Sequence, residues 1–336
     1  MLPAPPDPPP SSRRSLVIAS YLAVCTLWGS TYLAIAVALE GFPPFLLGAA
    51  RFLLAGAVIL SVARLRGEAW PDRAQWLGAA VTGFLLFVLG NGLISAAEQS
   101  LSSSVTAILA ATMPLWMTVF GRALGTPVSP REALGVALGL VGVVVMNTSG
   151  ELRASPAGVV MVLCSPMAWA VGSLAGQRLP MAPGMMRIGA QMLTGGVQMA
   201  LVAAALGERM AHVPSARALA AALYLLVAGS LIGFSAYSYL LRHTRPVVAT
   251  SYAYVNPVIA LALGTLVAGE SFDLASALGA AIILAAIVLV GLGRHRSPPA
   301  QQPAAAATAP QPGAPAPRSD PALRGLEDPA AAEPAR

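Results

Sequence analysis

The sequence predicts an all-α integral membrane protein whose ten transmembrane helices form two inverted five-helix repeats. Composition gives the class, because 56% of the 336 residues are apolar, 10% are charged and the mean hydropathy is +0.71. A soluble domain carries roughly 25% charged residues, so water is not the solvent for most of this surface. Ten apolar runs and an internal sequence repeat give the architecture.

The runs follow one another between two polar, proline-rich tails, residues 1–15 and 294–336, which we expect to be disordered. Arg13 and Arg14 also fit a twin-arginine export signal, but no cleavage site and soluble domain follow, which favours flanking charge on a first helix. Most runs are close to the roughly 20 residues that cross a bilayer, and the fifth is short. They are Leu16–Leu39, Pro44–Ala63, Trp76–Ala97, Val105–Leu124, Ala133–Asn147, Ala157–Gly176, Gly184–Leu206, Ala218–Leu241, Val247–Ala268 and Leu274–Gly293.

Arginines between the runs predict the orientation of the chain. With a cytoplasmic N-terminus, twelve arginines flank the spans inside and three lie outside, and the opposite orientation inverts this ratio. Cytoplasmic loops are enriched in basic residues, so both termini are expected in the cytoplasm. The inner set is Arg13, Arg14, Arg64, Arg66, Arg73, Arg122, Arg131, Arg178, Arg242, Arg245, Arg294 and Arg296; the outer set is Arg153, Arg209 and Arg217.

The two halves, residues 16–150 and 151–293, carry matching segments in the same order. Because each half has five helices, an odd number, the second copy enters the membrane from the opposite side. Many secondary transporters share this design and bind substrate near the midplane between the halves, although a repeat can also persist for packing alone. The matches are Trp28 with Trp169, Gly48–Gly56 with Ile188–Gly196, Pro114 with Pro257, and Ala133 with Ala277.

Six stretches along residues 16–293 carry a resemblance to a known family: Trp28–Ile35, Ala50–Gly56, Gly90–Glu98, Trp169–Ser173, Gly184–Met186 and Ala249–Val258. In these the chain resembles the EamA-type branch of the drug/metabolite transporter superfamily, especially its bacterial exporter group. The resemblance implies an inner-membrane carrier of amino acids, other metabolites or drugs, with a central cavity lined by helices one, three, four, six, eight and nine. Family members often place an acid after helix four, where this chain reads Gly125-Thr-Pro-Val.

The ninth run combines a proline with aromatic and amide side chains at membrane depth. Pro257 lacks an amide hydrogen and frees the carbonyl of Ala253, so we expect a kink there. Pro114 is the corresponding kink candidate in the fourth run. The alternative is that the polar side chains only satisfy the freed backbone groups. The candidate cavity-lining residues of the ninth run are Ser251, Tyr252, Tyr254 and Asn256.

Further binding candidates lie deep in the first, third and sixth runs. Trp28 and Trp169 sit away from the interface where tryptophan gathers, so their rings either stack on a flat or apolar substrate or fill the core. Thr31 and Tyr32 add polar groups beside Trp28. Asn91, between two glycines, either joins helices or faces a wet cavity.

Charged residues within the spans are few. Arg51, about eight residues into the second run, costs roughly 2.5–3.5 kcal/mol on insertion scales. Snorkelling or pairing with an acid is favoured for it over direct substrate contact. Acids fall at helix ends or in loops, and Glu98 is the nearest to a buried acid, so it is the candidate if transport is coupled to protons.

Other classes of protein fit the sequence less well. Three histidines and two cysteines lie apart, so no catalytic residue, metal ligand set or cofactor is expected, and an integral membrane enzyme is an unfavoured alternative. Arginines stand singly or in pairs between apolar runs, so nucleic-acid binding is not expected. The expected partners are a small-molecule substrate and membrane lipid.

Gly135, Gly139 and Gly142 favour close helix packing, within the fold or in a homodimer. An importer or facilitator stays open as the alternative to export.

Overall fold

The computed structural model describes residues 10–146, 148, 155–244, 252–271 and 273–294, and all regular structure in them is helical. The outer parts of both tails, residues 1–9 and 295–336, lie outside the described residues. The first helix begins at Pro10, so residues 10–15, expected in the N-terminal tail, are helical. Ser251 also lies outside the described residues.

The described residues form fifteen helical segments, which correspond to the ten runs of the sequence. The third and eighth spans each contain a π-helix between two α-helices, and the fourth is broken into two α-helices. The segments are α1 Pro10–Ala38, α2 Pro44–Leu65, α3 Arg73–Gly83, η1 Phe84–Gly92, α4 Leu93–Ala97, α5 Ser103–Ala110, α6 Met113–Ala123, α7 Pro130–Met146, α9 Pro156–Ala175, α10 Gly184–Ala205, α11 Ala216–Tyr224, η2 Leu225–Ile232, α12 Gly233–His243, α14 Tyr252–Leu266 and α15 Leu274–Arg294.

The predicted membrane fold is confirmed. Among the described residues, eight helical stretches are long and apolar enough to cross a bilayer, and Val255–Leu266 of α14 is a shorter apolar helix. The short fifth run forms α7, which packs along α15, a full span. These helices correspond in order to the ten runs of the sequence.

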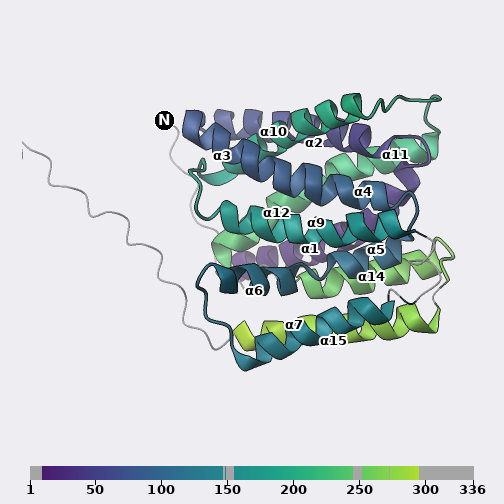
Figure 1. Cartoon of the computed structure of the whole chain (residues 1–336). Coiled ribbons are helices and arrows are strands. Elements are labelled where there is room, and N and C mark those ends of the chain that lie inside the picture. Colours follow the sequence, from purple (N-terminus) through teal and green to yellow (C-terminus); the bar gives the residue numbers. More distant parts are fainter. Residues whose placement is uncertain (1–9, 147, 149–154, 245–251, 272, 295–336) are drawn as a thin grey trace, which may run out of the picture. The chain divides into compact units, whose positions relative to one another are not determined.

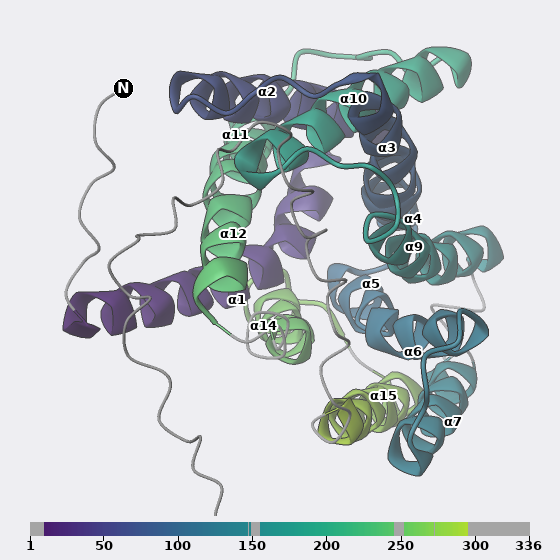
Figure 2. The ribbon, with the colours of Figure 1, turned by 90° about the vertical axis from the view of Figure 1, so that its left-hand side faces the viewer.

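Several repeat mates lie side by side in the helix bundle. The two most extensive helix pairs are α2 with α10 and α7 with α15, which are the second and the fifth helix of each half. Figures 1 and 2 show these two pairs on opposite edges of the bundle, with α1, α5, α9, α12 and α14 between them. The third and eighth spans are also placed equivalently, because η1 packs on α9 and η2 on α1.

Carboxylates at the ends of α2 and α10 show that this pair runs antiparallel. Glu68, just after α2, accepts a hydrogen bond from the backbone nitrogen of Met186 at the start of α10, at 2.8 Å. Glu208, just after α10, accepts one from the nitrogen of Leu46 at the start of α2, also at 2.8 Å. Each helix therefore caps the N-terminus of its mate, as the predicted inversion of the two repeats requires.

The glycines of α7 pack inside the chain. A Cβ on Gly135 would lie 2.9 Å from the carbonyl oxygen of Ala286, and one on Gly142 would lie 3.0 Å from the nitrogen of Ile283, both in α15. Glycine is needed there because the two backbones approach so closely. Of the two roles expected for these glycines, the structure shows packing within the fold.

Candidate functional site

A cavity of about 140 Å³ lies between the two halves, near the middle of the spans. The resemblance implied walls from helices one, three, four, six, eight and nine, and the structure adds Arg51 of the second helix. The first half contributes Trp28, Thr31, Tyr32, Ile35, Arg51, Asn91, Ile94, Ala107, Ala110, Ala111, Met113 and Pro114, and the second contributes Ser165, Pro166, Trp169, Phe234, Tyr252, Ala253, Asn256 and Pro257.

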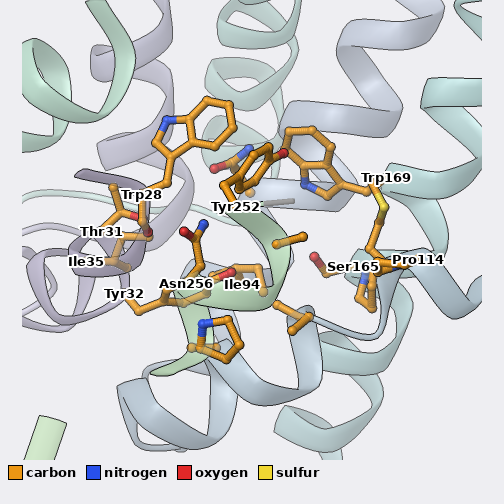
Figure 3. A pocket seen from close by; sticks show the side chains of 18 of the residues that line it. Trp28, Thr31, Tyr32, Ile35, Ile94, Pro114, Ser165, Trp169, Tyr252 and Asn256 are labelled. Atoms are coloured by element: carbon orange, nitrogen blue, oxygen red, sulfur yellow. The ribbon is translucent and has the colours of Figure 1, made fainter. Parts of the chain in front are cut away.

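Aromatic rings from several helices form one wall of the cavity. Trp28 is the centre of this cluster, with ring centroids 4.8 Å from Tyr252 and 5.0 Å from Phe234. Figure 3 shows Trp28, Tyr252 and Trp169 approaching the cavity from separate helices. Rings so arranged give a large apolar surface with polar edges, which suits a flat or apolar ligand.

Both cavity tryptophans sit on a π-helix of the opposite half. The indole Nε1 of Trp28 donates to the carbonyl oxygen of Gly229 in η2, at 3.0 Å. A Cβ at Gly90 in η1 would lie 2.6 Å from Cδ1 of Trp169, so that ring packs directly on the glycine. The tryptophans thus join the halves as well as lining the cavity.

A polar side chain in each π-helix accounts for one widened turn. Asn91 Nδ2 donates to the carbonyl oxygen of Leu86, five residues earlier, at 3.1 Å. Ser230 Oγ does the same to Leu225, also five residues earlier, at 3.2 Å. π-Bulges are frequently found at functional sites, and these two occupy equivalent positions in the repeats. Asn91 also lines the cavity, and its described amide bond stays within its own π-helix, so of the two roles expected for it the geometry agrees with facing the cavity and not with joining helices.

The two prolines behave differently. The fourth span breaks between α5 and α6, with Pro114 in the first turn of α6, where a missing N–H costs nothing. Pro257 instead lies inside α14, which continues through it. Asn256 is buried beside it, and its Nδ2 reaches the carbonyl oxygens of Tyr252 and Cys25 when the amide is turned to donate. This amide therefore joins α14 to α1 at the cavity wall.

The remaining candidates divide between the cavity and its surroundings. Thr31 and Tyr32 line it, although Thr31 Oγ1 donates to the carbonyl of Trp28 at 2.6 Å. Tyr254 lies in α14, and its side chain is outside what the structure describes. Glu98 lies outside the cavity lining, at the end of α4.

Arg51 is the one cation among the described lining residues. Its side chain is buried, and its Nε donates to Ser230 Oγ at 2.7 Å, which ties α2 to η2. The favoured sequence interpretations, snorkelling or pairing with an acid, do not fit this geometry. No described carboxylate lies within ion-pair distance of Arg51.

Sequence reasoning missed several lining residues. Ser165 lines the cavity and donates to the carbonyl oxygen of Gly90 at 2.9 Å. Its position beside Pro166 within a span is a signal that could have singled it out. Phe234 follows Gly233 in the eighth run, and no pattern in the sequence around it distinguishes it from other apolar residues of that run. Small apolar residues of α5 resemble lipid-facing ones, so nothing in the sequence singled them out.

Comparison with known proteins identifies this architecture. The profile of the EamA-like transporter family matches residues 15–148 and again residues 156–292. The chain belongs to the EamA-like transporter family. It is 38% identical over 283 residues to the "Uncharacterized inner membrane transporter YedA" of Escherichia coli (strain K12), covering 84% of this chain and 92% of that protein.

More distant relatives agree with the family assignment. The chain is 26% identical over 275 residues to "Protein PecM" of Dickeya dadantii (strain 3937), covering 81% of this chain and 90% of PecM. A solved crystal structure superposes with a TM-score of 0.57 at 21% identity, over 84% of this chain and 99% of that one, and supports the fold alone. This member of the EamA-like family is therefore a multi-pass inner-membrane transporter.

Proposed function

We propose that the chain exports small metabolites, such as amino acids and related compounds, or amphipathic drugs by alternating access between its two repeats. The observation that carries this proposal is the cavity, because both halves supply its walls near the middle of the spans. A site placed there is reached from either side when one half rocks against the other.

Contacts between the halves support this mechanism. The caps made by Glu68 and Glu208 hold α2 and α10 together at both ends, and α7 and α15 pair equally closely. These edge pairs are suited to act as fixed axes. Apart from α2, which contributes Arg51, the helices that line the cavity lie between them and supply the moving walls; these include α1, α9 and α14 (Figure 2).

The direction of transport rests on the expected orientation and on the resemblance to exporters. Twelve arginines at one side of the spans against three at the other favour cytoplasmic termini. Fusing a reporter to Met1 and, separately, to Arg336 tests this orientation. Reporters on different sides of the membrane would contradict both the orientation and the inverted design.

Export is tested by overexpressing the protein in a bacterial host and comparing the compounds released and the growth under a panel of toxic compounds. The matched variants are Trp169→Ala, which removes a cavity ring, and Trp116→Ala, which removes a ring that stacks on Phe120 outside the cavity lining. Trp169→Ala should abolish most release, and Trp116→Ala should retain it. Full release by Trp169→Ala at equal expression would count against the cavity as the binding site.

The alternative is an importer or facilitator of the same compounds. Inside-out vesicles and right-side-out vesicles, each incubated with a released compound in the medium, separate these cases. Accumulation against a gradient in inside-out vesicles supports export. Equal rates in both directions without accumulation would support a facilitator.

A further inference from the structure

We propose that the substrate is a small organic anion with an apolar or aromatic body, and that Arg51 binds its carboxylate. The inference rests on the proposed transport function and names the substrate class of that cavity. Three observations carry it: the position of the Arg51 guanidinium, the absence of a described acid beside it, and the chemistry of the remaining lining.

The guanidinium of Arg51 lies next to the aromatic wall. A Cβ on Gly229 would lie 3.0 Å from Arg51 Nη2 and 3.1 Å from Thr31 Cγ2, so these two lining side chains meet at the glycine. Gly229 is also the residue whose carbonyl accepts the Trp28 indole N–H. A ligand that stacks on Trp28 is therefore within reach of the cation.

The hydrogen-bonding capacity of Arg51 is largely unused. A guanidinium has five N–H donors, and the described residues give Arg51 one hydrogen bond, to Ser230 Oγ. Its side chain is 8% exposed, and no described carboxylate pairs with it. Burying a cation with so few hydrogen-bond acceptors costs free energy unless an anion or other acceptors bind to it. A carboxylate fits the guanidinium because it can accept two parallel hydrogen bonds.

The rest of the lining selects against a positively charged ligand. Aromatic faces such as those of Trp28 and Tyr252 attract cations in general, but here they stand beside a fixed positive charge. The described lining residues include no Asp or Glu that would neutralise an ammonium group. Repulsion between two cations is strong in a site of low dielectric constant. An anion thus satisfies Arg51, and a zwitterion leaves its ammonium without an acidic partner.

Four compounds of similar shape test this ranking: 3-phenylpropionate, phenylalanine, 3-phenylpropanamide and 2-phenylethylamine. Binding to the purified full chain in nanodiscs is measured by equilibrium dialysis at neutral pH. We expect 3-phenylpropionate to bind most tightly, about tenfold or more tighter than the amide, as expected for hydrogen bonds to a charged group. The amine should bind most weakly.

Variants separate recognition by Arg51 from a structural role. Arg51→Gln should bring 3-phenylpropionate and the amide to equal affinity without weakening the amide. Arg51→Lys keeps the charge and should keep part of the preference. Ser230→Ala, which removes the one described hydrogen-bond partner of Arg51 and leaves the Phe52 ring beneath the guanidinium, should keep the preference. Arg187→Gln is the matched control, because Arg187 donates to the Gly176 carbonyl away from the cavity lining.

Several results would overturn the inference. These are tighter binding of phenylalanine or of the amine than of 3-phenylpropionate, binding of none of the four, or an unchanged preference in Arg51→Gln. If Arg51→Gln is too unstable to purify, loss of the preference in Arg51→Lys, with amide affinity retained, supports the inference, and equal weakening of both compounds contradicts it. Export of an amine by active protein would overturn this inference alone, whereas a chain that moves no compound in either vesicle type would overturn the proposed function.

Discussion

The carboxylate of Glu270 accepts hydrogen bonds from both the backbone nitrogen and the hydroxyl of Ser103, at 2.9 Å and 2.7 Å. The backbone nitrogen of Ser104 also donates to it, at 3.1 Å. Glu270 follows α14 in the second half, and Ser103 begins α5 in the first, so the contact ties repeat mates together. Anions are favoured at helix N-termini, where the first amides have no partner within the helix.

We expect Glu270→Ala to lower the free energy of unfolding by about 1–2 kcal/mol, as the loss of other N-terminal caps does. Denaturant titration of the purified protein in micelles measures this. Glu40→Ala is the matched control, because Glu40 pairs at 3.5 Å with Arg217 and both side chains are well exposed. Its effect should stay within about 0.5 kcal/mol. Equal losses in the two variants would contradict the capping role.

The class of fold could be predicted because hydropathy and run length act locally. Each span can be recognised from about 20 consecutive apolar residues. The internal repeat and the arginine bias then predict how the spans are arranged and oriented. The cap made by Glu270 was not predictable in the same way. Its partner Ser103 lies 167 residues away in the sequence, so the contact is set by tertiary packing alone.

Residues of the cavity were predictable where they are unusual for a membrane span. Trp28, Trp169, Asn91 and Asn256 stood out because deep tryptophans and amides need a reason to be there. Arg51 is also unusual for a span, but its position in the cavity depends on its bond to Ser230 in η2. A π-helix inserts one extra residue without a strong sequence signature. The orientation of its side chain therefore needed the structure.

The reciprocal caps of α2 and α10 should contribute independently. Glu208→Ala and Glu68→Ala each remove hydrogen bonds to a helix N-terminus, and each should cost about 1 kcal/mol of unfolding free energy. The two sites are about 30 Å apart, given the rise of 1.5 Å per residue along a helix. The double variant should therefore lose the sum of the two effects. A double variant no less stable than either single one would show that the caps are not separate stabilising contacts.

Close backbone approach should make Gly56 intolerant of a side chain. A Cβ there would lie 2.6 Å from the backbone nitrogen of Leu193 in α10, and backbone cannot move aside cheaply. We expect Gly56→Val to lower stability by about 1–3 kcal/mol or more, as overpacking does. Ala57→Val, on the exposed side of the same helix, should be nearly neutral. The measurement is the yield of monodisperse protein together with denaturant titration, and similar losses in both variants would argue against tight pairing of α2 with α10.

Glu98 is a buried carboxyl group just after the last residue of the third span. Neither of its oxygens has a hydrogen-bond partner among the described residues. Burial, and next the negative charge of Glu270, raise the pKa of Glu98 well above its ordinary value. The folded protein therefore holds a proton here at pH values where the unfolded chain has released it.

The raised pKa of Glu98 determines the direction in which stability changes with pH, and Glu98 also offers a test of proton coupling. Because the folded state binds more protons, the stability of the wild type should fall as pH rises from the ordinary range of a carboxyl group through the raised pKa of Glu98. Glu98→Gln should flatten that fall, whereas Glu40→Gln, at an exposed carboxylate, should leave it unchanged. Denaturant titrations across this range provide the measurement, and parallel curves for Glu98→Gln and wild type would refute the assignment. If Glu98 also carries the coupling proton, Glu98→Gln proteoliposomes should transport at the same rate with and without a pH gradient, while the wild type responds to the gradient.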